Sequence, residues 1–307
     1  MNYRRTFLKD GISGLIGDVF IYLFMIFVMV VTLYPFINML AISFNDALDG
    51  VLGGIRLWPR KFSTFNYENI FRNPHIVQAT YISVARTVIG SIANLAACLC
   101  LAYTLSRKEF LLRFAFLKIL VFSMYIYGGL VPFFLLMRFL GFLNTFSVYI
   151  IPGMVSAFNV IIFRSYIETA IPDSLIESAR LDGASEFLIL FKIVCPLSLP
   201  VIATVLLWNS VGQWNSWFDA MLFNNTSQHL STLQYELQKI LQQTIQVAAV
   251  GDTARLAADM AAGRGQVTTP QATRAAMTVV ATVPILLVYP FVQKYFIHGL
   301  TIGGVKE

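Results

Sequence analysis

Charged residues are scarce in this sequence. Asp, Glu, Lys and Arg make up 12% of its 307 residues, whereas hydrophobic residues make up 57%. A soluble globular domain typically carries about 25% charged residues, so the composition excludes an ordinary soluble domain and indicates an integral membrane protein embedded in a lipid bilayer. The net charge of +6 comes without a basic run that carries interleaved aromatic residues. Nucleic acid is therefore not an expected partner.

Cysteine and histidine are also rare, with three of each. Cys98 and Cys100 lie in an apolar run and Cys195 precedes a proline, so we expect buried, unreactive thiols and no metal site. The chain has no G-x-x-x-x-G-K-[ST], H-E-x-x-H or G-x-S-x-G signature. It is therefore not expected to be an enzyme, to hydrolyse ATP or to bind a cofactor of its own.

What the sequence has in plenty is long stretches without charge. A membrane helix needs about 20 predominantly apolar residues. Six stretches that lack Asp, Glu, Lys and Arg are at least 19 residues long: 19–45, 87–106, 119–137, 139–163, 193–218 and 275–293. The sequence predicts an all-α integral membrane protein with six transmembrane helices.

The distribution of positive charge predicts the orientation of these helices. If both termini are cytoplasmic, the inner segments carry 12 Lys and Arg and the outer segments 10, although the outer segments are longer. The excess has the sign expected for cytoplasmic segments. The start "YRRTFLKDG" resembles a twin-arginine signal but lacks a following cleavage site. We interpret residues 1–18 as a cytoplasmic N-terminal segment and 19–307 as one transmembrane domain, with inner loops 107–118 and 164–192 and outer segments 46–86 and 219–274.

A charged and glycine-broken passage, "IESARLDGASEFLILFKIVCPLSLP", interrupts this apolar sequence at residues 176–200. Ser174 and Glu177 have the spacing of a capping box, which predicts the start of a helix. Gly183 is expected to end that helix, and a second one follows over about 185–194. Pro196 and Pro200 then mark the entry to the fifth transmembrane helix.

The passage has two interpretations on local chemistry alone. It is either an ordinary hairpin at the membrane surface, with Glu177 as a cap and Asp182 as a turn residue, or a docking element for another protein. The second is favoured by a lone aromatic residue that could anchor in a pocket, Phe187, and by small residues that allow close approach: Ala179, Gly183 and Ala184.

This passage resembles the coupling-loop signature of ABC importer permeases, E-A-A-x-x-D-G-A followed by P-L-x-x-P. The matching residues are Glu177, Ala179, Asp182, Gly183, Ala184, Pro196, Leu197 and Pro200, and Ser178 stands where alanine is commonest. The resemblance implies that 166–198 is a coupling loop. It also implies that 177–187, including Phe187, transmits the closure of an ATPase dimer to the membrane helices.

Three further passages resemble carbohydrate importer permeases, most of all the subgroup for oligosaccharides or complex sugars, close to the maltose-type G subunit. They are "YGGLVPFFLLMRFLGFLNT" (127–145), "GQWNSWFDAML" (212–222) and "GLTIGGVKE" (299–307). The resemblance implies a bacterial inner-membrane importer for oligosaccharides, with a second homologous permease subunit, two ATPase subunits that hold ATP and Mg, and an extracytoplasmic sugar-binding protein. A cytoplasmic tail, 296–307, would reach the ATPases through Gly303 and Gly304.

A sugar pathway needs hydrogen-bonding groups and aromatic faces. Asn209, Gln213 and Ser216 follow one another at i, i+4 and i+7, on one face of a helix. Trp214 and Trp217 flank this face, although tryptophan is also enriched at membrane interfaces. Other candidates are Tyr125 and Tyr127 on the third stretch, which Gly128, Gly129 and Pro132 interrupt.

The outer segment is expected to contain an amphipathic helix over 228–245, either packed over the membrane helices as a lid or contacting the sugar-binding protein. Residues 246–272 are expected to be variably folded.

Two other classes remain as alternatives: a secondary transporter or channel without an ATPase, and a membrane enzyme or assembly subunit. The absence of charge from all six stretches argues against the former, because ion-driven transporters usually place ionisable residues in the membrane.

Overall fold

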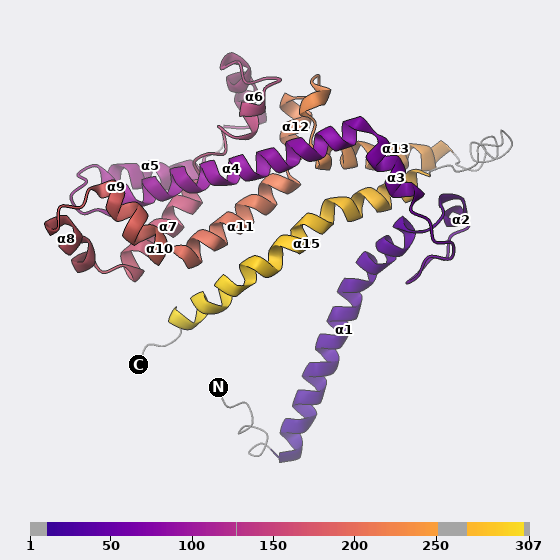
Figure 1. The fold of residues 1–307 in the computed structure, drawn as a ribbon, viewed down its shortest axis with the longest axis horizontal. Helices are drawn as coiled ribbons and strands as arrows, with labels where there is room; N and C mark the ends of the chain where they lie inside the picture. Colours follow the sequence, from indigo (N-terminus) through magenta and orange to yellow (C-terminus); the bar gives the residue numbers. More distant parts are fainter. Residues whose placement is uncertain (1–10, 127, 251–268, 304–307) are drawn as a thin grey trace. The chain divides into compact units, whose positions relative to one another are not determined.

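The computed structural model describes residues 11–126, 128–250 and 269–303 (Figure 1). All named secondary-structure elements among these residues are helices. Within the same residues, β-type pairing is limited to an isolated antiparallel bridge between Asn45 and Phe62. The all-α prediction is confirmed for this part of the chain.

The chain divides into two compact units. One comprises residues 1–72 and 240–280, and the other comprises 73–239 and 281–307. The first contains α1 (Gly11–Ser43), α2 (Ala47–Val51) and α3 (Phe65–Arg72). Two helices, α13 (Leu233–Val250) and α15 (Pro270–Gly303), contribute residues to both units.

Two buried asparagines organise the turn after α1 in the first unit. The Oδ1 atom of Asn45 accepts hydrogen bonds from the backbone N–H groups of Arg60 (2.7 Å) and Lys61 (3.0 Å). The amide of Asn66 donates to the carbonyls of Ser43 and Asn45. Side chains thus satisfy backbone groups that the end of a helix leaves without partners.

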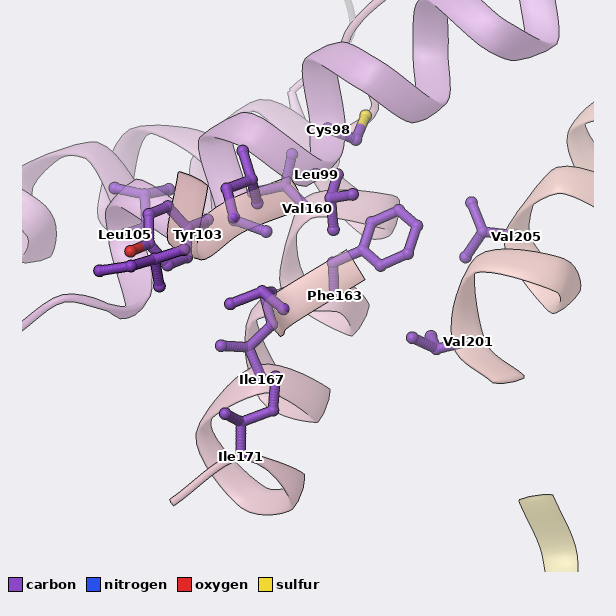
Figure 2. Close-up of a cluster of buried hydrophobic side chains, with 14 of the residues drawn as sticks. Cys98, Leu99, Tyr103, Leu105, Val160, Phe163, Ile167, Ile171, Val201 and Val205 are labelled. Atoms are coloured by element: carbon purple, nitrogen blue, oxygen red, sulfur yellow. The ribbon is translucent and has the colours of Figure 1, made fainter. Parts of the chain in front are cut away.

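The second unit is built on α4 (Pro74–Ser106), along which α7 (Ala157–Ala170) and α11 (Leu199–Asn215) pack. Figure 2 shows the hydrophobic cluster that these helices share. Its labelled members are Cys98, Leu99, Tyr103 and Leu105 from α4, Val160, Phe163 and Ile167 from α7, Ile171 just after it, and Val201 and Val205 from α11. Burial of these side chains fixes the three helices against one another.

Shorter elements complete the second unit. They are α5 (Arg113–Tyr125), α6 (Leu130–Phe139), η2 (Phe146–Tyr149), α8 (Asp173–Leu181), α9 (Glu186–Ile189), η3 (Leu190–Val194), α10 (Cys195–Leu197), α12 (Phe218–Phe223) and η4 (Gln228–Leu230). Figure 1 shows α8, α9 and α10 gathered near one end of α4.

Three helical segments among the described residues are long and apolar enough to cross a membrane: Gly17–Ser43, Pro74–Ser106 and Pro270–Val288. The number rises to five if each of two bent pairs, α5 with α6 and Glu186–Leu197 with α11, is a single span. The break between α5 and α6 falls at the predicted interruption, with Gly129 at φ +91° before Leu130. Six spans stay a prediction.

The fourth predicted transmembrane helix, 139–163, is wrong as one continuous element. Gly141 (φ +73°) and Asn144 (φ +57°) adopt left-handed conformations that break a helix, and the next long helix, α7, begins only at Ala157. It continues past the charge-free stretch and includes Arg164 and Glu168, which pair at 2.7 Å. Counting charge-free residues located the apolar region but ignored the backbone signals that end helices.

The amphipathic helix predicted at 228–245 exists, beginning at Leu233 after η4. Leu230, Leu233 and Leu237 are buried, and the backbone N–H of Leu233 donates to Ser83 Oγ at 2.8 Å. This end of the helix therefore packs on its own unit, which fits the lid interpretation. The expectation for 246–272 falls largely on 251–268, outside the described residues.

Candidate functional site

The turn between α8 and α9 is closed by backbone hydrogen bonds around Gly183. The Gly183 N–H donates to the Arg180 carbonyl and the Ala184 N–H to the Ala179 carbonyl, both at 3.0 Å. Gly183 itself has φ +83°. This is a Schellman motif, in which glycine occupies the left-handed position at low cost. The prediction that Gly183 ends the first helix is confirmed.

The capping box predicted at Ser174 and Glu177 is wrong. Helix α8 begins at Asp173 with Pro172 before it, so Ser174 already lies inside the first turn, and its carbonyl accepts the Ser178 hydroxyl. Pro172 is the extended residue before the helix, and the acidic Asp173 in the first turn interacts favourably with the helix dipole. A capping side chain is found instead at α9, where Ser185 Oγ accepts from the Leu188 N–H at 3.3 Å.

One surface of this helix–turn–helix is exposed and contains most of the coupling residues expected from the resemblance. Glu177, Ser178, Asp182, Gly183 and Phe187 all lie on it. Phe187 is 73% exposed. Its ring is free for a partner.

Two of the expected coupling residues do not lie on the exposed surface. Ala179 and Ala184 pack against the chain's own hydrophobic cluster, so their small size brings the two short helices close to α4. Leu181, which occupies an open position of the signature, is 90% exposed beside the turn. The sequence analysis missed it because no periodic pattern distinguishes it.

The second half of the signature forms a corner. Pro196 lies in the first turn of the short helix α10, and Pro200 lies in the first turn of the 17-residue helix α11, as predicted. Helix α11 leaves at 83° to the segment Glu186–Leu197. Leu197 is exposed, and its carbonyl accepts the Tyr166 hydroxyl at 3.3 Å.

A polar cavity of about 410 Å³ lies between α4 and α11, with α6, α12 and the 148–153 segment closing its sides. Its polar and aromatic lining residues are Arg86, Asn94, Phe133, Tyr149, Trp208, Asn209, Gln213, Ser216, Asp219 and Phe223. Amides and aromatic faces together are the groups that bind sugar hydroxyls and ring faces.

Arg86 is the organising charge of this cavity. Its side chain is 2% exposed and pairs with the Asp219 carboxylate through two nitrogens, with Nη1 3.1 Å from Oδ1. It also donates to the Ser216 carbonyl and lies 4.4 Å from the centre of the Tyr149 ring. A buried guanidinium is tolerable here because a carboxylate neutralises it and its donors are occupied.

Arg86 also sets the orientation of Gln213. Nε and Nη2 of Arg86 donate to Gln213 Oε1 at 3.2 and 2.9 Å. Because a guanidinium can only donate, the amide oxygen must face it and the amide nitrogen must face away. A Cβ atom added to Gly90 would lie 2.9 Å from that nitrogen, so glycine leaves the space in which the amide sits.

Three asparagines tie the inner part of the cavity together. Asn94 Oδ1 accepts from Asn159 at 2.9 Å and from Asn209 at 2.6 Å, and its amide donates to the Gly153 carbonyl. These contacts join α4, α7 and α11. Asn209 also accepts from Asn159 at 3.2 Å, so both ends of its amide are engaged within the protein, whereas the Gln213 amide nitrogen has the cavity beside it.

The structure brings together some of the predicted pathway residues and separates others. Asn209 and Gln213 line the cavity with Ser216. Trp214 is buried elsewhere, with its indole N–H donating to the Ala281 carbonyl at 2.8 Å. Trp217 precedes α12 with its ring edge-on to that of Phe218, and does not line the cavity.

The remaining expectations fall at the ends of elements. Tyr125 ends α5 and is 84% exposed, away from the cavity, whereas Tyr127 lies outside the described residues. Gly303 is the last residue of α15, and Gly304 also lies outside the described residues.

Arg86 and Asp219 are the charged site residues that the sequence analysis missed, and it also missed the lining residues Asn94, Tyr149 and Trp208. The second charge-free stretch began after Arg86, yet α4 begins at Pro74 and contains it. The inference that the membrane helices lack ionisable residues is therefore wrong for α4. A usable signal was the spacing of Arg86, Gly90 and Asn94, which places all three on one helix face.

The structure also bears on the thiols and on metal binding. Cys98 is buried as expected and Cys195 is partly buried, but the expectation is wrong for Cys100, which is exposed. Within the described ranges, no group of three or more His, Cys, Asp or Glu side chains is placed to hold a metal ion.

Comparison with known proteins identifies the family. Residues 8–302 match the model of the binding-protein-dependent transport system inner membrane component. The chain is 37% identical over 291 residues to the polygalacturonan/rhamnogalacturonan transport system permease protein YtcP of Bacillus subtilis (strain 168), covering 94% of this chain and 98% of that protein. It is 34% identical to protein LplC of the same organism, covering 96% of each.

A solved structure agrees with these relatives. A bacterial ABC transporter involved in the import of the acidic polysaccharide alginate contains a chain that matches with a TM-score of 0.79 at 29% identity, covering 94% of this chain and 98% of that one. The protein thus belongs to the family of binding-protein-dependent transport system inner membrane components. It is a transport permease subunit of the ABC importer type.

Proposed function

We propose that this chain is one permease subunit of an ATP-driven importer for oligosaccharides or related sugars. It forms half of the translocation pathway and couples that pathway to ATPase subunits through residues 177–187. The proposal rests on family membership together with one structural observation: the signature residues form an exposed, rigid helix–turn–helix at one end of α4.

The shape of this element fits a docking role. Gly183 closes the turn, and the exposed Leu181 and Phe187 flank it as apolar side chains with no cover from the chain itself. Glu177 and Asp182 add charge on the same exposed element. Such a combination, apolar anchors within a polar surround, is typical of a surface that inserts into a groove of a soluble partner.

The polar cavity fits the pathway role. It offers the Gln213 amide nitrogen as a donor and the rings of Trp208, Phe133 and Phe223 as apolar faces. An oligosaccharide presents many hydroxyl oxygens and apolar ring faces, which these groups match. Relatives whose names include polygalacturonan/rhamnogalacturonan and alginate transport support the same class of cargo.

The full assembly that we propose has further parts. A second, homologous permease subunit completes the pathway, two ATPase subunits bind ATP and Mg, and an extracytoplasmic binding protein delivers the sugar. The chain crosses the bacterial inner membrane six times with both termini in the cytoplasm, and the tail with Gly303 and Gly304 lies near the ATPases. Description of the family as a binding-protein-dependent inner membrane component supports this arrangement.

The coupling role is testable with surface variants that do not disturb the fold. We expect Phe187→Ala and Glu177→Ala to reduce co-purification of the ATPase subunits with the permease pair, because both side chains are exposed and available to a partner. Thermal unfolding of the permease should be unchanged. Leu111→Ala is the matched control, since Leu111 is 93% exposed but outside the signature. Equal retention of the ATPases by all three variants would contradict the proposal.

A further inference from the structure

An ion-pair cluster centred on Arg180 joins the coupling element to α4. Arg180 is in the last turn of α8, at a position that the coupling signature leaves open. Its Nη1 donates to Glu109 in the segment after α4, and its Nε donates to Glu186 on α9 at 2.8 Å. One guanidinium therefore bridges two carboxylates from different elements, which its planar fork of donors allows.

The cluster continues into the membrane helix. Tyr103 on α4 is 5% exposed and donates its hydroxyl to the second oxygen of Glu186. The Arg107 guanidinium lies 5.0 Å from the centre of the Tyr103 ring. The two carboxylate oxygens of Glu186 therefore accept hydrogen bonds from different elements, one from Arg180 of α8 and the other from Tyr103 of α4.

Apolar packing reinforces these contacts. Leu99, Ala102 and Tyr103 of α4 share a hydrophobic cluster with Ile176 of α8 and Ile189 of α9, all of them buried. A buried cluster moves as one body because it has few alternative packings. The coupling element and this end of α4 consequently form a single block.

Two routes lead from this block to the polar cavity. The route along the chain passes through the π-helical turn η3 and the 83° corner before α11. Such features allow bending. The other route is α4, a single helix of 33 residues without an internal proline. It carries Tyr103 at one end and Arg86 about 26 Å away along its axis, at a rise of about 1.5 Å per residue.

We propose that Arg180 is a positioning residue that directs the motion of the coupling element into α4, so that α4, together with α11 packed along it, moves the cavity wall. This inference rests on the proposed function, because it presumes that an ATPase moves 177–187. Arg180 need not touch the ATPase or the sugar. Its role is to keep α8, α9 and α4 moving together.

The test measures access to the cavity in the complete complex in lipid nanodiscs. Gly212 lines the cavity and no atom lies within 4 Å of an added Cβ, so Gly212→Cys supplies a thiol for a maleimide. Cys100 and Cys195 are replaced by alanine to remove the accessible native thiols. We expect ATP with vanadate to change the labelling rate by about fivefold or more, the lower end of typical coupling between distant sites.

In this background Arg180→Met should retain the ATPase subunits and ATP hydrolysis but lose the ATP-dependent change in labelling. Arg180→Lys should keep part of the change, because a lysine can satisfy one carboxylate but not bridge both in a fixed geometry. It also serves as the second variant if methionine impairs folding. Lys108→Met is the control: it removes a pair with Asp173 in the same region whose side chains are 75% and 53% exposed, and such pairs contribute little.

The outcomes separate this inference from the proposed function. If Arg180→Met keeps the full change in labelling, or if it loses the ATPase subunits, the assignment of Arg180 as a transmitting residue is overturned. The proposed function stands in both cases. If the complex with Arg180 intact shows no ATP-dependent change at position 212, the proposed coupling itself fails.

Discussion

At the scale of single residues, Arg86 has the most demanding environment in the second unit. Its guanidinium is 2% exposed, and Asp219, Gln213 and the Ser216 carbonyl accept hydrogen bonds from it. Burial removes both charges from water, and the close, two-point contact between Arg86 and Asp219 offsets this desolvation cost. The pair therefore contributes more to the shape of the cavity than to its net charge.

Removal of one partner of this pair should be costly. Arg86→Met leaves Asp219 without its counter-ion, and we expect a loss of about 3 kcal/mol or more in the free energy of unfolding. The double variant Arg86→Met/Asp219→Asn removes both charges and should recover much of that loss. Thermal unfolding of the purified complex measures both effects. A double variant no more stable than the single one would show that the pair is not coupled.

The space beside Gly90 gives a second residue-scale prediction. An added Cβ would approach Gln213 Nε2 to 2.9 Å and Cδ to 3.0 Å, so Gly90→Ala should displace the amide that Arg86 orients. We expect sugar uptake to fall severalfold while the fold persists, because alanine favours the helix by about 1 kcal/mol over glycine. Gly212→Ala is the matched control, since that position is open. Equal uptake by both variants would contradict this role of Gln213.

At the scale of elements, the coupling helix–turn–helix depends on ionised carboxylates. The Tyr103 hydroxyl and then Arg180 hold the pKa of Glu186 below its usual value. The Arg180 guanidinium likewise lowers the pKa of Glu109, and Lys108 lowers the pKa of Asp173. A carboxylate with a lowered folded-state pKa stabilises the fold above its unfolded-state pKa.

Acidification should therefore loosen this element. Stability from these groups is fully present above the ordinary pKa values of 4.5 for Glu and 3.8 for Asp, and it is lost as the pH falls below them through the folded-state values. Hydrogen exchange of residues 173–189, corrected for intrinsic rates, measures this between pH 6 and pH 3.5. We expect protection to fall at the acid end in the parent. In Arg180→Met it should be lower and fall less with acid, because Tyr103 and Lys108 still hold Glu186 and Asp173. An equal fall in both proteins would place its origin away from Arg180.

The sequence correctly predicted the helix boundaries that single residues determine. Gly183 ends α8, and Pro196 and Pro200 lie in the first turns of α10 and α11, because each acts on its own backbone. The capping box failed because the helix begins at Asp173, two positions before the start that a cap at Ser174 requires. The stretch 139–163 failed because glycine and asparagine turns outweighed its apolar composition.

The cavity was only partly predictable because its contacts join distant parts of the chain. Arg86 and Asp219 are 133 residues apart, and Asn94 and Asn209 are 115 apart. Helical spacing placed Asn209 and Gln213 on a common face but could not tell which side of the helix Trp214 would occupy. Pairing across such distances depends on how helices pack, which periodicity within one segment does not encode.

At the scale of the whole molecule, the single chain leaves much apolar surface uncovered. In α1, none of the residues in the most apolar 18-residue window of Gly17–Ser43 is buried by other parts of the chain. A surface of this kind is covered by lipid or by another subunit. Family membership makes the chain one part of a larger transport system, and the exposed coupling element and the open cavity are the two surfaces through which we propose it acts.

The most direct test of this account is the energy source of transport. Membrane vesicles containing the complete complex would be supplied with a radiolabelled oligosaccharide that the binding protein of the same system retains. The account predicts uptake that requires ATP, requires the binding protein, is lost in Gly183→Pro and survives collapse of the proton gradient. Uptake that persists after ATP depletion and stops when the ion gradient collapses would contradict it and indicate a secondary transporter.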